Sequence, residues 1–599
     1  MLERTTHNLT DYTTASQSLG GRRALLAVLV IATTAAMLWL MAIALSASGF
    51  GVVDAVILIL FGLTLPWTVI GFWNSVIGFL IIRFARDPIA TVTPIAARVR
   101  GDERITASTA ILVCIRNEPP ARVIRNIEPM MQELVGAGVG DRFKLFVLSD
   151  TNRPDVATIE EAQFGELAAR WHGRLDLVYR RRETNEGFKA GNIRDFCERW
   201  GDEHEFAVTL DTDSFIPASA VLRMVRVIQA DPKLGILQGL VVGLPSTSAF
   251  ARIFQFGMRL GMRSWTIGSA WWQGDCGPYW GHNAVIRLAP FIAHCHIPTL
   301  PGTGVLSGHV LSHDQVEAAL MRRAGYEVRV LPEEDLGWEE NPPTLIEFIR
   351  RDQRWCQGTL QYSFFLFAPG MKFVSRFQLA FAMLMFLSSP AWIGLLVVGT
   401  LALAFAPTPA DFIRPDAGYA LLIITLVMWF APKIATVLDV LTRPELRRAF
   451  GGTARFLTSV VTETVFFILL SPIMWFCHTL FLAGLPFGRV IGWIGQVRDD
   501  HIVSWSAALR QLWPHSVLGL GSLAIVAVTH PTALPYVFLL AGGPALSVPL
   551  AVITALPAVG TALVRVGIGR LPEETAPPAM LASLALPAVV AAASKPRSA

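Results

Sequence analysis

Long apolar runs flank one polar region of the chain. Two runs, at residues 24–45 and 52–82, precede the polar region, and the later runs lie at 377–405, 418–440, 456–487 and 517–564. A helix needs about 20 apolar residues to cross a bilayer core of about 30 Å. The pattern therefore predicts a polytopic α-helical membrane domain that holds one soluble domain, residues 84–376.

Basic residues predict the topology, because loops on the cytoplasmic side of a membrane are enriched in Lys and Arg. Arg22 and Arg23 precede the first run, and Arg83 and Arg86 follow the second. We therefore expect the soluble domain to be cytoplasmic. The other predicted segments are a cytoplasmic N-terminal segment at 1–22, two membrane helices within 23–83, membrane or interfacial helices within 377–570, cytoplasmic loops at 441–455 and 488–514, and a flexible tail at 571–599.

The run at 456–487 conflicts with this topology. It is long enough to cross the membrane once, yet arginines flank it and predict that both of its ends are cytoplasmic. Pro472 lies in its middle. We therefore expect an interfacial helix or a re-entrant hairpin here. The next apolar stretch, 517–564, is broken at His530-Pro531 and holds two or three spans.

The soluble domain alternates short apolar strands with helices. Strand-like runs lie at 109–116, 143–149, 175–179 and 206–210, and helix-like stretches at 120–134, 157–171, 190–200 and 218–230. This alternation predicts a doubly wound α/β domain with a mostly parallel sheet. Ligands of such sheets bind at the carboxyl ends of the strands, so polar residues at these ends are the first candidates for a site.

Composition narrows the classes of function. The chain has 599 residues, of which 53% are hydrophobic and 16% charged, and its formal net charge is +4. So small a charge does not predict a nucleic-acid partner. Six cysteines without a Cys-x-x-Cys pair argue against a zinc or disulfide framework and fit a reducing cytoplasm.

Acidic and amide side chains follow three of the predicted strands. Asn117 and Glu118 follow the first, Asp150 the second, and the Asp211-x-Asp213 pair the fourth. Any one of them alone is explained equally well as a cap of a turn or helix. Three such groups at one sheet edge favour a ligand site, and the Asp-x-Asp pair offers the hard oxygen ligands that Mg²⁺ and Mn²⁺ share with phosphates.

Two further residues open helices. Lys189 lies at the start of a predicted helix, where a phosphate is also stabilised by the helix N-terminus. Asp314 follows Ser312-His313 and opens another helix. It is interpreted either as a helix-capping residue or as the general base that a glycosyl transfer needs.

Aromatic side chains mark two more candidate segments. Trp280 and His282 lie in an aromatic, glycine-rich stretch, and Gln353-Arg354-Trp355 lies just before the third apolar run. Aromatic rings pack against the apolar faces of sugars. The alternatives are a packed core for the first segment and a membrane-interface anchor for the second.

As a set, these motifs resemble the processive family 2 glycosyltransferases, of which cellulose synthase is a member. Within that family the resemblance is to the branch that makes the backbone of osmoregulated periplasmic glucans, and it covers roughly residues 20–560. The motifs that the chain shares are Arg116-Asn-Glu, Asp211-Thr-Asp-Ser, Gly281-His-Asn, Leu311-Ser-His-Asp and Arg354-Trp-Cys-Gln-Gly.

The resemblance implies a GT-A fold, UDP-glucose as donor, and a divalent metal, Mg²⁺ or Mn²⁺. It also implies a role for each candidate: uridine binding by Asn117, Glu118 and Asp150, nucleotide binding by Lys189 and Asp211, metal and diphosphate binding by Asp213 with Asp211, base catalysis by Asp314, and acceptor or diphosphate binding by Trp280, His282, Gln353, Arg354 and Trp355.

The resemblance further implies the product and the partners. These are a growing glucan chain, β-1,2-linked and exported to the periplasm, an acyl carrier protein, and the lipid of the bacterial inner membrane. Two departures matter. Arg351 stands where the family pattern Gln-x-x-Arg-Trp begins, and Ser312-His-Asp replaces Thr-Glu-Asp.

Two alternatives stay open. A cellulose, hyaluronan or chitin synthase has the same architecture and differs in its product. A transporter with a nucleotide-sensing domain belongs to another class and predicts paired charges inside its spans. The sequence contains no Gly-x-x-x-x-Gly-Lys-Ser/Thr motif for the phosphate-binding loop of many such domains.

Overall fold

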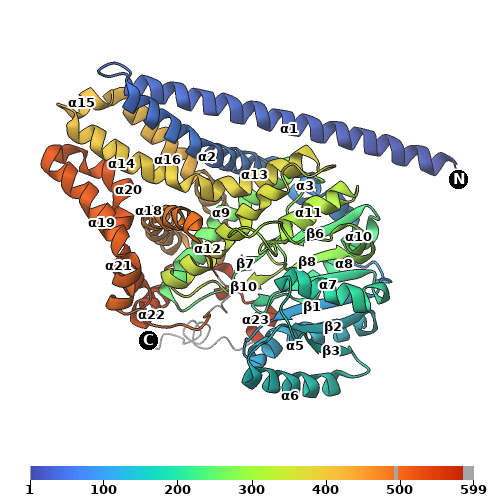
Figure 1. Ribbon diagram of the computed structural model, residues 1–599. Helices are drawn as coiled ribbons and strands as arrows, with labels where there is room; N and C mark the ends of the chain where they lie inside the picture. Colours follow the sequence, from blue (N-terminus) through green and yellow to red (C-terminus); the bar gives the residue numbers. More distant parts are fainter. Residues whose placement is uncertain (1, 492–496, 584–599) are drawn as a thin grey trace.

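The computed structural model describes residues 2–491 and 497–583, and it has two parts (Figure 1). An α/β domain lies beside a group of long helices, in agreement with the sequence pattern. Residues 492–496 of the predicted loop 488–514 and residues 584–599 of the predicted tail lie outside the described residues.

The α/β domain is built on a seven-stranded sheet with the order β3-β2-β1-β4-β8-β6-β9. β8 is antiparallel to both of its neighbours and the other pairs are parallel, which confirms the predicted mostly parallel sheet. The strands are β1 (Thr109–Ile115), β2 (Phe143–Ser149), β3 (Leu177–Arg181), β4 (Phe206–Leu210), β6 (Leu234–Gly239), β8 (Ala284–Arg287) and β9 (Glu327–Leu331).

One predicted strand is displaced. β3 begins at Leu177, not at residue 175, because the backbone N–H of Leu175 still donates to Trp171 at the end of the preceding helix. The other three predicted strands agree with the structure to within one residue. The strands that the sequence pattern missed, β6, β8 and β9, complete the sheet on the far side of β4.

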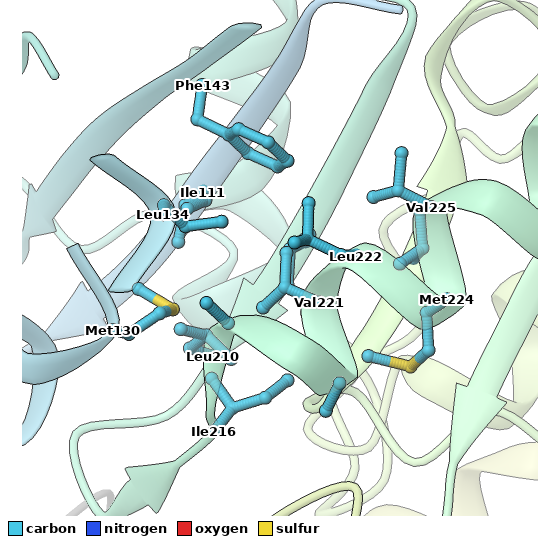
Figure 2. Packing of buried hydrophobic residues seen from close by; sticks show 14 of the residues in the cluster. Ile111, Met130, Leu134, Phe143, Leu210, Ile216, Val221, Leu222, Met224 and Val225 are labelled. Carbon is cyan, nitrogen blue, oxygen red and sulfur yellow. The ribbon is translucent and has the colours of Figure 1, made fainter. Parts of the chain in front are cut away.

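Helices cover both faces of this sheet. One face carries α5 (Pro120–Gly136), α6 (Pro154–Trp171) and α8 (Ala218–Ala230), and the other carries α7 (Phe188–Trp200), α10 (Leu288–His294) and α11 (Asp314–Arg323). On the first face, Met130, Leu134 and Val221 pack against Ile111 of β1 and Leu210 of β4 (Figure 2). Each buried aliphatic side chain of this size contributes about 1.5–3 kcal/mol, so the core fixes the strand ends.

A second, three-stranded sheet lies beside the end of β4. Its order is β5-β10-β7, and its strands are β5 (Ser214–Phe215), β10 (Trp338–Glu339) and β7 (Val242–Gly243). β5 directly follows Asp213, so the position of this small sheet sets the position of the Asp-x-Asp pair.

Within the part of the chain that the structure describes, six helices or helix pairs are long and apolar enough to cross a membrane, and with their composition they define a multi-pass membrane protein. They span Ser18–Leu45 of α1 (Leu2–Leu45), α2 (Val52–Phe84), Phe373–Phe405, which joins α13 (Phe373–Leu387) to α14 (Ser389–Phe405), α16 (Pro415–Thr442), α18 (Thr453–Gly484) with its short extension to Phe487, and α19 (Trp505–Thr529). A further pair, α20 (Leu534–Ala545) and α21 (Ser547–Thr554), is bent by 57°.

Shorter helices complete the chain. Before β1 lie α3 (Pro88–Val92) and α4 (Pro94–Arg98), and the others are α15 (Pro409–Phe412), α17 (Pro444–Ala449), α22 (Pro557–Val566) and α23 (Ala579–Ser583).

Two buried helices, α9 (Ala249–Gln273) and α12 (Leu345–Leu360), join the α/β domain to the membrane helices. α9 packs closely on α2 through two glycines. A Cβ atom on Gly78 would lie 1.8 Å from the carbonyl oxygen of Ser264, and one on Gly268 would lie 1.8 Å from that of Asn74. A side chain at either position would separate the helices, so these glycines fix the α/β domain against α2.

The disputed run at 456–487 forms one continuous helix, α18, with Pro472 inside it. A hairpin or re-entrant loop at this place is therefore wrong. In Figure 1 α18 is seen nearly along its axis, whereas α1 lies across the picture. At its C-terminal end, His478 Nε2 contacts Asp352 of α12 at 2.5 Å. α18 thus contacts α12, and it is also one of the helices long and apolar enough to cross a membrane, so the interfacial placement stays a prediction.

The predicted flexible tail is wrong for residues 571–583. These residues pack on the α/β domain, where Met580 and Leu581 are each 2% exposed. Glu573 and Glu574 form ion pairs with Arg259 and Arg252 of α9. Richness in Ala and Pro predicted disorder, but the segment carries two acids and three large apolar side chains, Leu571, Met580 and Leu581, that find partners.

Candidate active site

A cavity of about 480 Å³ lies at the carboxyl ends of β1, β2 and β4, under α12 and α13. It contains ten of the residues predicted from the sequence. They are Glu118, Asp150, Lys189, Asp211, Asp213, Trp280, His282, Asp314, Arg354 and Trp355. Two predicted residues, Asn117 and Gln353, are not among the side chains that line the cavity.

The segment after β1 adopts a strained turn beside the cavity. Asn117 has a φ of 63°, and its side-chain amide donates to Asn152 Oδ1 at 2.9 Å, outside the cavity. Phe188 and Asn283, with φ of 52° and 49°, are the other described non-glycine residues with positive φ. Phe188 lines the cavity and Asn283 follows His282. Strain of this kind concentrates at functional sites because the surrounding structure imposes it.

Glu118 reaches into the cavity from the same turn. Its carboxylate accepts a hydrogen bond from the backbone N–H of Arg116. Burial raises the pKa of Glu118 to about 7, although that hydrogen bond and the Arg498 guanidinium act in the opposite direction. The group therefore changes its charge near neutral pH.

Asp150, at the end of β2, is held by an arginine that the sequence analysis did not single out. Arg182 donates to both carboxylate oxygens of Asp150, at 2.7 Å each. It also donates to the carbonyl oxygens of Glu186, in the loop before α7, and of Phe188, the first residue of α7. Arg182 thereby joins the end of β2 to the loop that positions Lys189. Its place directly after β3 is the one sequence signal for this role.

The Asp-x-Asp pair sits on a turn. The backbone N–H of Ser214 donates to the carbonyl oxygen of Asp211, so both carboxylates reach the cavity although strand alternation would separate them. Lys189 donates to Asp211 and to the carbonyl oxygen of Gly281, the latter at 2.7 Å. Burial alone would raise the pKa of Asp211, but Lys189 and His282 hold it well below its usual range.

Asp213 is paired with Arg498, which comes from the loop after α18. Two neighbours of Arg498 also bind the α/β domain. Asp499 pairs with Arg122 at 3.0 Å, and Asp500 accepts from the Thr247 hydroxyl at 2.7 Å. Burial opposes the charge of Arg498, but Asp213, Glu340 and Glu118 outweigh it and raise its pKa. In the sequence, Arg498 is one of the basic residues that predict topology, and no motif indicates its place in the site.

Asp211 and Asp213 fit a divalent cation that arrives bound to a diphosphate. Among the described residues, no three His, Cys, Asp or Glu side chains form a metal cluster. Asp211 and Asp213 therefore offer one or two carboxylates. Mg²⁺ and Mn²⁺ sites of that kind take their other ligands from water and substrate phosphates.

Asp314 lines the cavity from another element, at the first residue of α11. Gly281 faces it, and a Cβ at Gly281, whose φ is +82°, would lie 3.4 Å from the Asp314 Cβ. The Tyr362 hydroxyl hydrogen-bonds to Asp314 and to Ser312. Burial and the Asp314 charge raise the pKa of Tyr362 well above its usual value, so this hydroxyl stays protonated. No sequence motif marks Tyr362, which lies in the short turn Gln361–Phe364 directly after α12.

α12 presents a cationic and aromatic face to the cavity. Arg351, Arg354 and Trp355 line it, and the Arg351 guanidinium lies 4.7 Å from the centre of the Trp355 ring. Residues three and four apart share one face of a helix, whereas residue 353 points elsewhere. The structure therefore replaces the predicted Gln353 with Arg351. Burial lowers the pKa of Arg351 and of Arg354, although each stays a cation at neutral pH.

The remaining predicted residues close the side between α9 and β8. The backbone N–H of Trp280 donates to Gln238 Oε1 at 2.7 Å, which fixes the strand end beside it. His282 Nε2 lies 3.7 Å from Glu339 Oε2 of β10. Toward the membrane helices the lining becomes apolar, with Met258 and Met262 of α9 and Ala382 and Met385 of α13. The cavity thus extends from the sheet edge to the membrane part.

Comparison with known proteins agrees with this geometry. A model of the glycosyl transferase family group 2 matches residues 206–540, more than half of the chain. Together with the sheet and the flanking apolar helices, this match defines a family 2 glycosyltransferase of the GT-A fold within a membrane protein.

Several relatives bear one name, glucans biosynthesis glucosyltransferase H. The protein of Xylella fastidiosa (strain 9a5c) is 34% identical over 96% of this chain and 91% of its own length. That of Xanthomonas campestris pv. campestris (strain B100) is 33% identical over 95% and 90%. The chain belongs to the glucans biosynthesis glucosyltransferase H family.

The lengths of the relatives differ. The Pseudomonas putida (strain W619) protein is 35% identical over 87% of this chain, and the match spans 62% of that relative's length. Among solved structures, a mannosyltransferase from Pyrobaculum calidifontis overlaps with a TM-score of 0.37 and 14% identity, over 61% of this chain and 98% of that chain.

Proposed function

We propose that this chain is a membrane-embedded, inverting glucosyltransferase. It uses UDP-glucose and builds the β-1,2-linked backbone of osmoregulated periplasmic glucans. The observation that supports this most strongly is one cavity in which a charged half, with Asp211 and Asp213, faces Asp314 and Trp355. A nucleotide sugar and an acceptor sugar need such a pair of halves, because transfer takes place where they meet.

The reaction needs one displacement. Asp314 accepts the proton of the acceptor hydroxyl while the hydroxyl oxygen attacks the anomeric carbon of the donor. The bond between that carbon and the diphosphate oxygen breaks, and UDP leaves with the bonding electrons. Attack from the side opposite the leaving group inverts the configuration, so an α-linked donor gives a β-linkage. No covalent enzyme intermediate is required.

Charged side chains stabilise the leaving diphosphate. Arg354 and Arg351 of α12, Lys189 of α7 and Arg498 line the same half of the cavity. In a cavity shielded from water, fixed cations stabilise developing negative charge more strongly than they do in solution. A divalent cation held by Asp213 and Asp211 would add Lewis-acid neutralisation of the diphosphate oxygens.

The acceptor binds on the membrane side. Trp355 is 43% exposed at the cavity, so its ring is available to a sugar face. Because the lining beyond it is apolar and belongs to α9 and α13, the growing glucan leaves toward the membrane helices. The basic residues at the ends of the first two spans predict that the cavity lies on the cytoplasmic side of the bacterial inner membrane, so export follows synthesis. An acyl carrier protein is the expected soluble partner.

Product analysis tests this function. The chain, purified in detergent, is supplied with UDP-[³H]glucose and Mg²⁺ or Mn²⁺, with and without acyl carrier protein. We expect labelled polymer that a β-1,2-specific glucanase digests. The Asp314→Asn variant should make no polymer.

Other outcomes decide between the alternatives. Polymer that resists the β-1,2-specific enzyme would contradict the product and support a cellulose-like or hyaluronan-like synthase. Failure to release UDP from any nucleotide sugar, in protein that still binds UDP, would contradict the transferase function. It would support the alternative of a transporter with a nucleotide-sensing domain.

A further inference from the structure

The C-terminal segment 571–583 lies against the small sheet β5-β10-β7 on the side away from the cavity. Met580 and Leu581 complete an apolar cluster with Phe215 of β5, Val242 of β7 and Trp338 of β10. Trp338 is 2% exposed and Phe215 is fully buried. The segment therefore covers the side chains that β5 and β10 direct away from the cavity.

Glu573 adds a polar connection to the same strand. One of its oxygens accepts from the Trp338 indole N–H at 3.2 Å and from Arg259 of α9 at 2.9 Å. The Glu573 side chain is 6% exposed and that of Arg259 is 10% exposed. Glu574 pairs with Arg252 of α9 at 2.8 Å, between side chains that are 6% and 2% exposed. Two buried acids thus fix the segment to α9 and β10.

The opposite side of the small sheet belongs to the donor half of the cavity. Successive side chains of a strand point to opposite faces. Trp338 faces the segment, while its neighbour Glu339 lines the cavity beside His282. In the same way Phe215 faces the segment, while the Ser214 hydroxyl accepts from the backbone N–H of Asp211. The pairing of Trp338 with Phe215 and of Glu339 with Ser214 couples the two faces.

We propose that residues 571–583 are a positioning segment for the donor site. By holding Trp338 and Phe215, the segment fixes Glu339 and the turn that carries Asp211 and Asp213. The ligand whose binding the segment affects is therefore the one held by the turn, a divalent cation with a nucleoside diphosphate. Glu573 contacts neither and acts through β10. The proposal rests on the proposed function for the identity of the nucleotide.

The test separates binding from turnover. In the full-length chain, Glu573→Ala should raise the KM for UDP-glucose and the Mn²⁺ concentration for half activation about tenfold, because breaking a buried pair loosens the strand that it holds. The kcat should change by less than about threefold, because Asp314 is positioned by α11 and not by β10. Calorimetric binding of Mn²⁺-UDP gives the same comparison without catalysis. The matched control is Glu445→Ala, which removes an exposed glutamate of α17.

Two milder variants keep the test decisive if Glu573→Ala does not accumulate. Glu573→Gln retains an oxygen for the indole N–H and should recover part of the affinity. Trp338→Phe keeps the ring but removes its N–H, and should weaken Mn²⁺-UDP binding in the same direction. Unchanged Mn²⁺-UDP affinity in these folded variants would overturn the proposal, as would a fall in kcat at constant KM.

The two proposals fail separately. If the wild-type chain binds Mn²⁺-UDP but transfers no glucose, the function is wrong, and the loss of binding in Glu573→Ala still supports the positioning segment. If the wild-type chain makes glucan and Mn²⁺-UDP binding ignores these substitutions, the segment is structural and the function stands.

Discussion

The two halves of the cavity treat their carboxylates differently. In the donor half three acids have a cation of the chain beside them: Asp150 has Arg182, Asp211 has Lys189, and Asp213 has Arg498. In the acceptor half, Asp314 hydrogen-bonds instead to a neutral partner, the Tyr362 hydroxyl. The difference corresponds to two tasks, the binding of an anionic donor and the removal of a proton.

The comparison also distinguishes charge from within the α/β domain from charge that a distant segment supplies. Arg182 and Lys189 come from the α/β domain itself, next to the acids that they contact. Arg498 reaches Asp213 from a loop that follows a membrane-side helix, a separation of 285 positions. We expect Arg498 to exchange the carboxylate for the diphosphate when the donor binds, whereas the hydroxyl beside Asp314 leaves a carboxylate ready to accept a proton.

The largest effect is expected at the base. Asp314→Asn removes proton acceptance and should lower kcat about 10³-fold, within the range that general base catalysis supplies. Mn²⁺-UDP affinity should stay within about twofold, because the donor half is intact. Asp213→Asn should do the reverse and weaken Mn²⁺-UDP binding first. Steady-state kinetics and calorimetry on both variants measure these effects, with Asp416→Asn as control. Equal changes of kcat and of Mn²⁺-UDP affinity in the two variants would contradict the division into a donor half and an acceptor half.

The second-largest effect is expected at Arg498. Arg498→Ala should lower kcat/KM about 10²-fold, the cost usually seen when one group that stabilises developing charge is lost. Arg498→Lys should recover part of the rate. Arg510→Ala, which removes an exposed arginine of α19, is the matched control. Equal rates in Arg498→Ala and wild type would mean that the loop only packs against the domain.

A smaller effect is expected from the hydroxyl beside the base. Tyr362→Phe should lower kcat about tenfold, because a hydrogen bond to a charged group stabilises it by about 1.5–3 kcal/mol. The loss should appear in kcat, while Mn²⁺-UDP affinity stays within about twofold, because Tyr362 lies beside the base. Tyr419→Phe, at an exposed tyrosine of α16, serves as control. Weakened Mn²⁺-UDP binding in Tyr362→Phe would assign Tyr362 to packing.

The smallest effect concerns stability. Burial raises the pKa of Glu118 from 4.5 to about 7, so its charged form opposes folding. This cost is absent below pH 4.5, grows as pH rises toward 7, and is complete above 7. Glu118→Gln should therefore unfold at a higher temperature than wild type at pH 8 and at the same temperature near pH 4.5. The apparent Tm in detergent across this range is the measurement, and a constant difference would contradict it.

Local patterns were enough to predict most of the α/β domain. β1, β2 and β4 are buried runs of branched and aromatic residues followed by polar turns, and these turns hold Glu118, Asp150 and Asp213 at one edge. The helix period also explains which residues of one motif reach the cavity. Positions 351, 354 and 355 share a face of α12 and line it, whereas Gln353 is not among the lining residues.

Long-range partners were not predictable in this way. Arg498 lies among basic residues that the membrane topology already explains, and only the fold brings it to Asp213. Tyr362 has no motif because its role depends on the place where α12 ends. Residues 571–583 have a disordered composition as a whole. Their order depends on Glu573 meeting Arg259, a residue 314 positions away.

A structure of the chain with Mn²⁺ and a non-transferable UDP-glucose analogue tests the central claim most directly. The account predicts the uracil beside Asp150, the diphosphate and metal at Asp213 with Arg498 turned to the phosphates, and the anomeric carbon facing Asp314. A nucleotide bound elsewhere, or one whose sugar points away from Asp314, would contradict the division of the cavity into a donor half and an acceptor half.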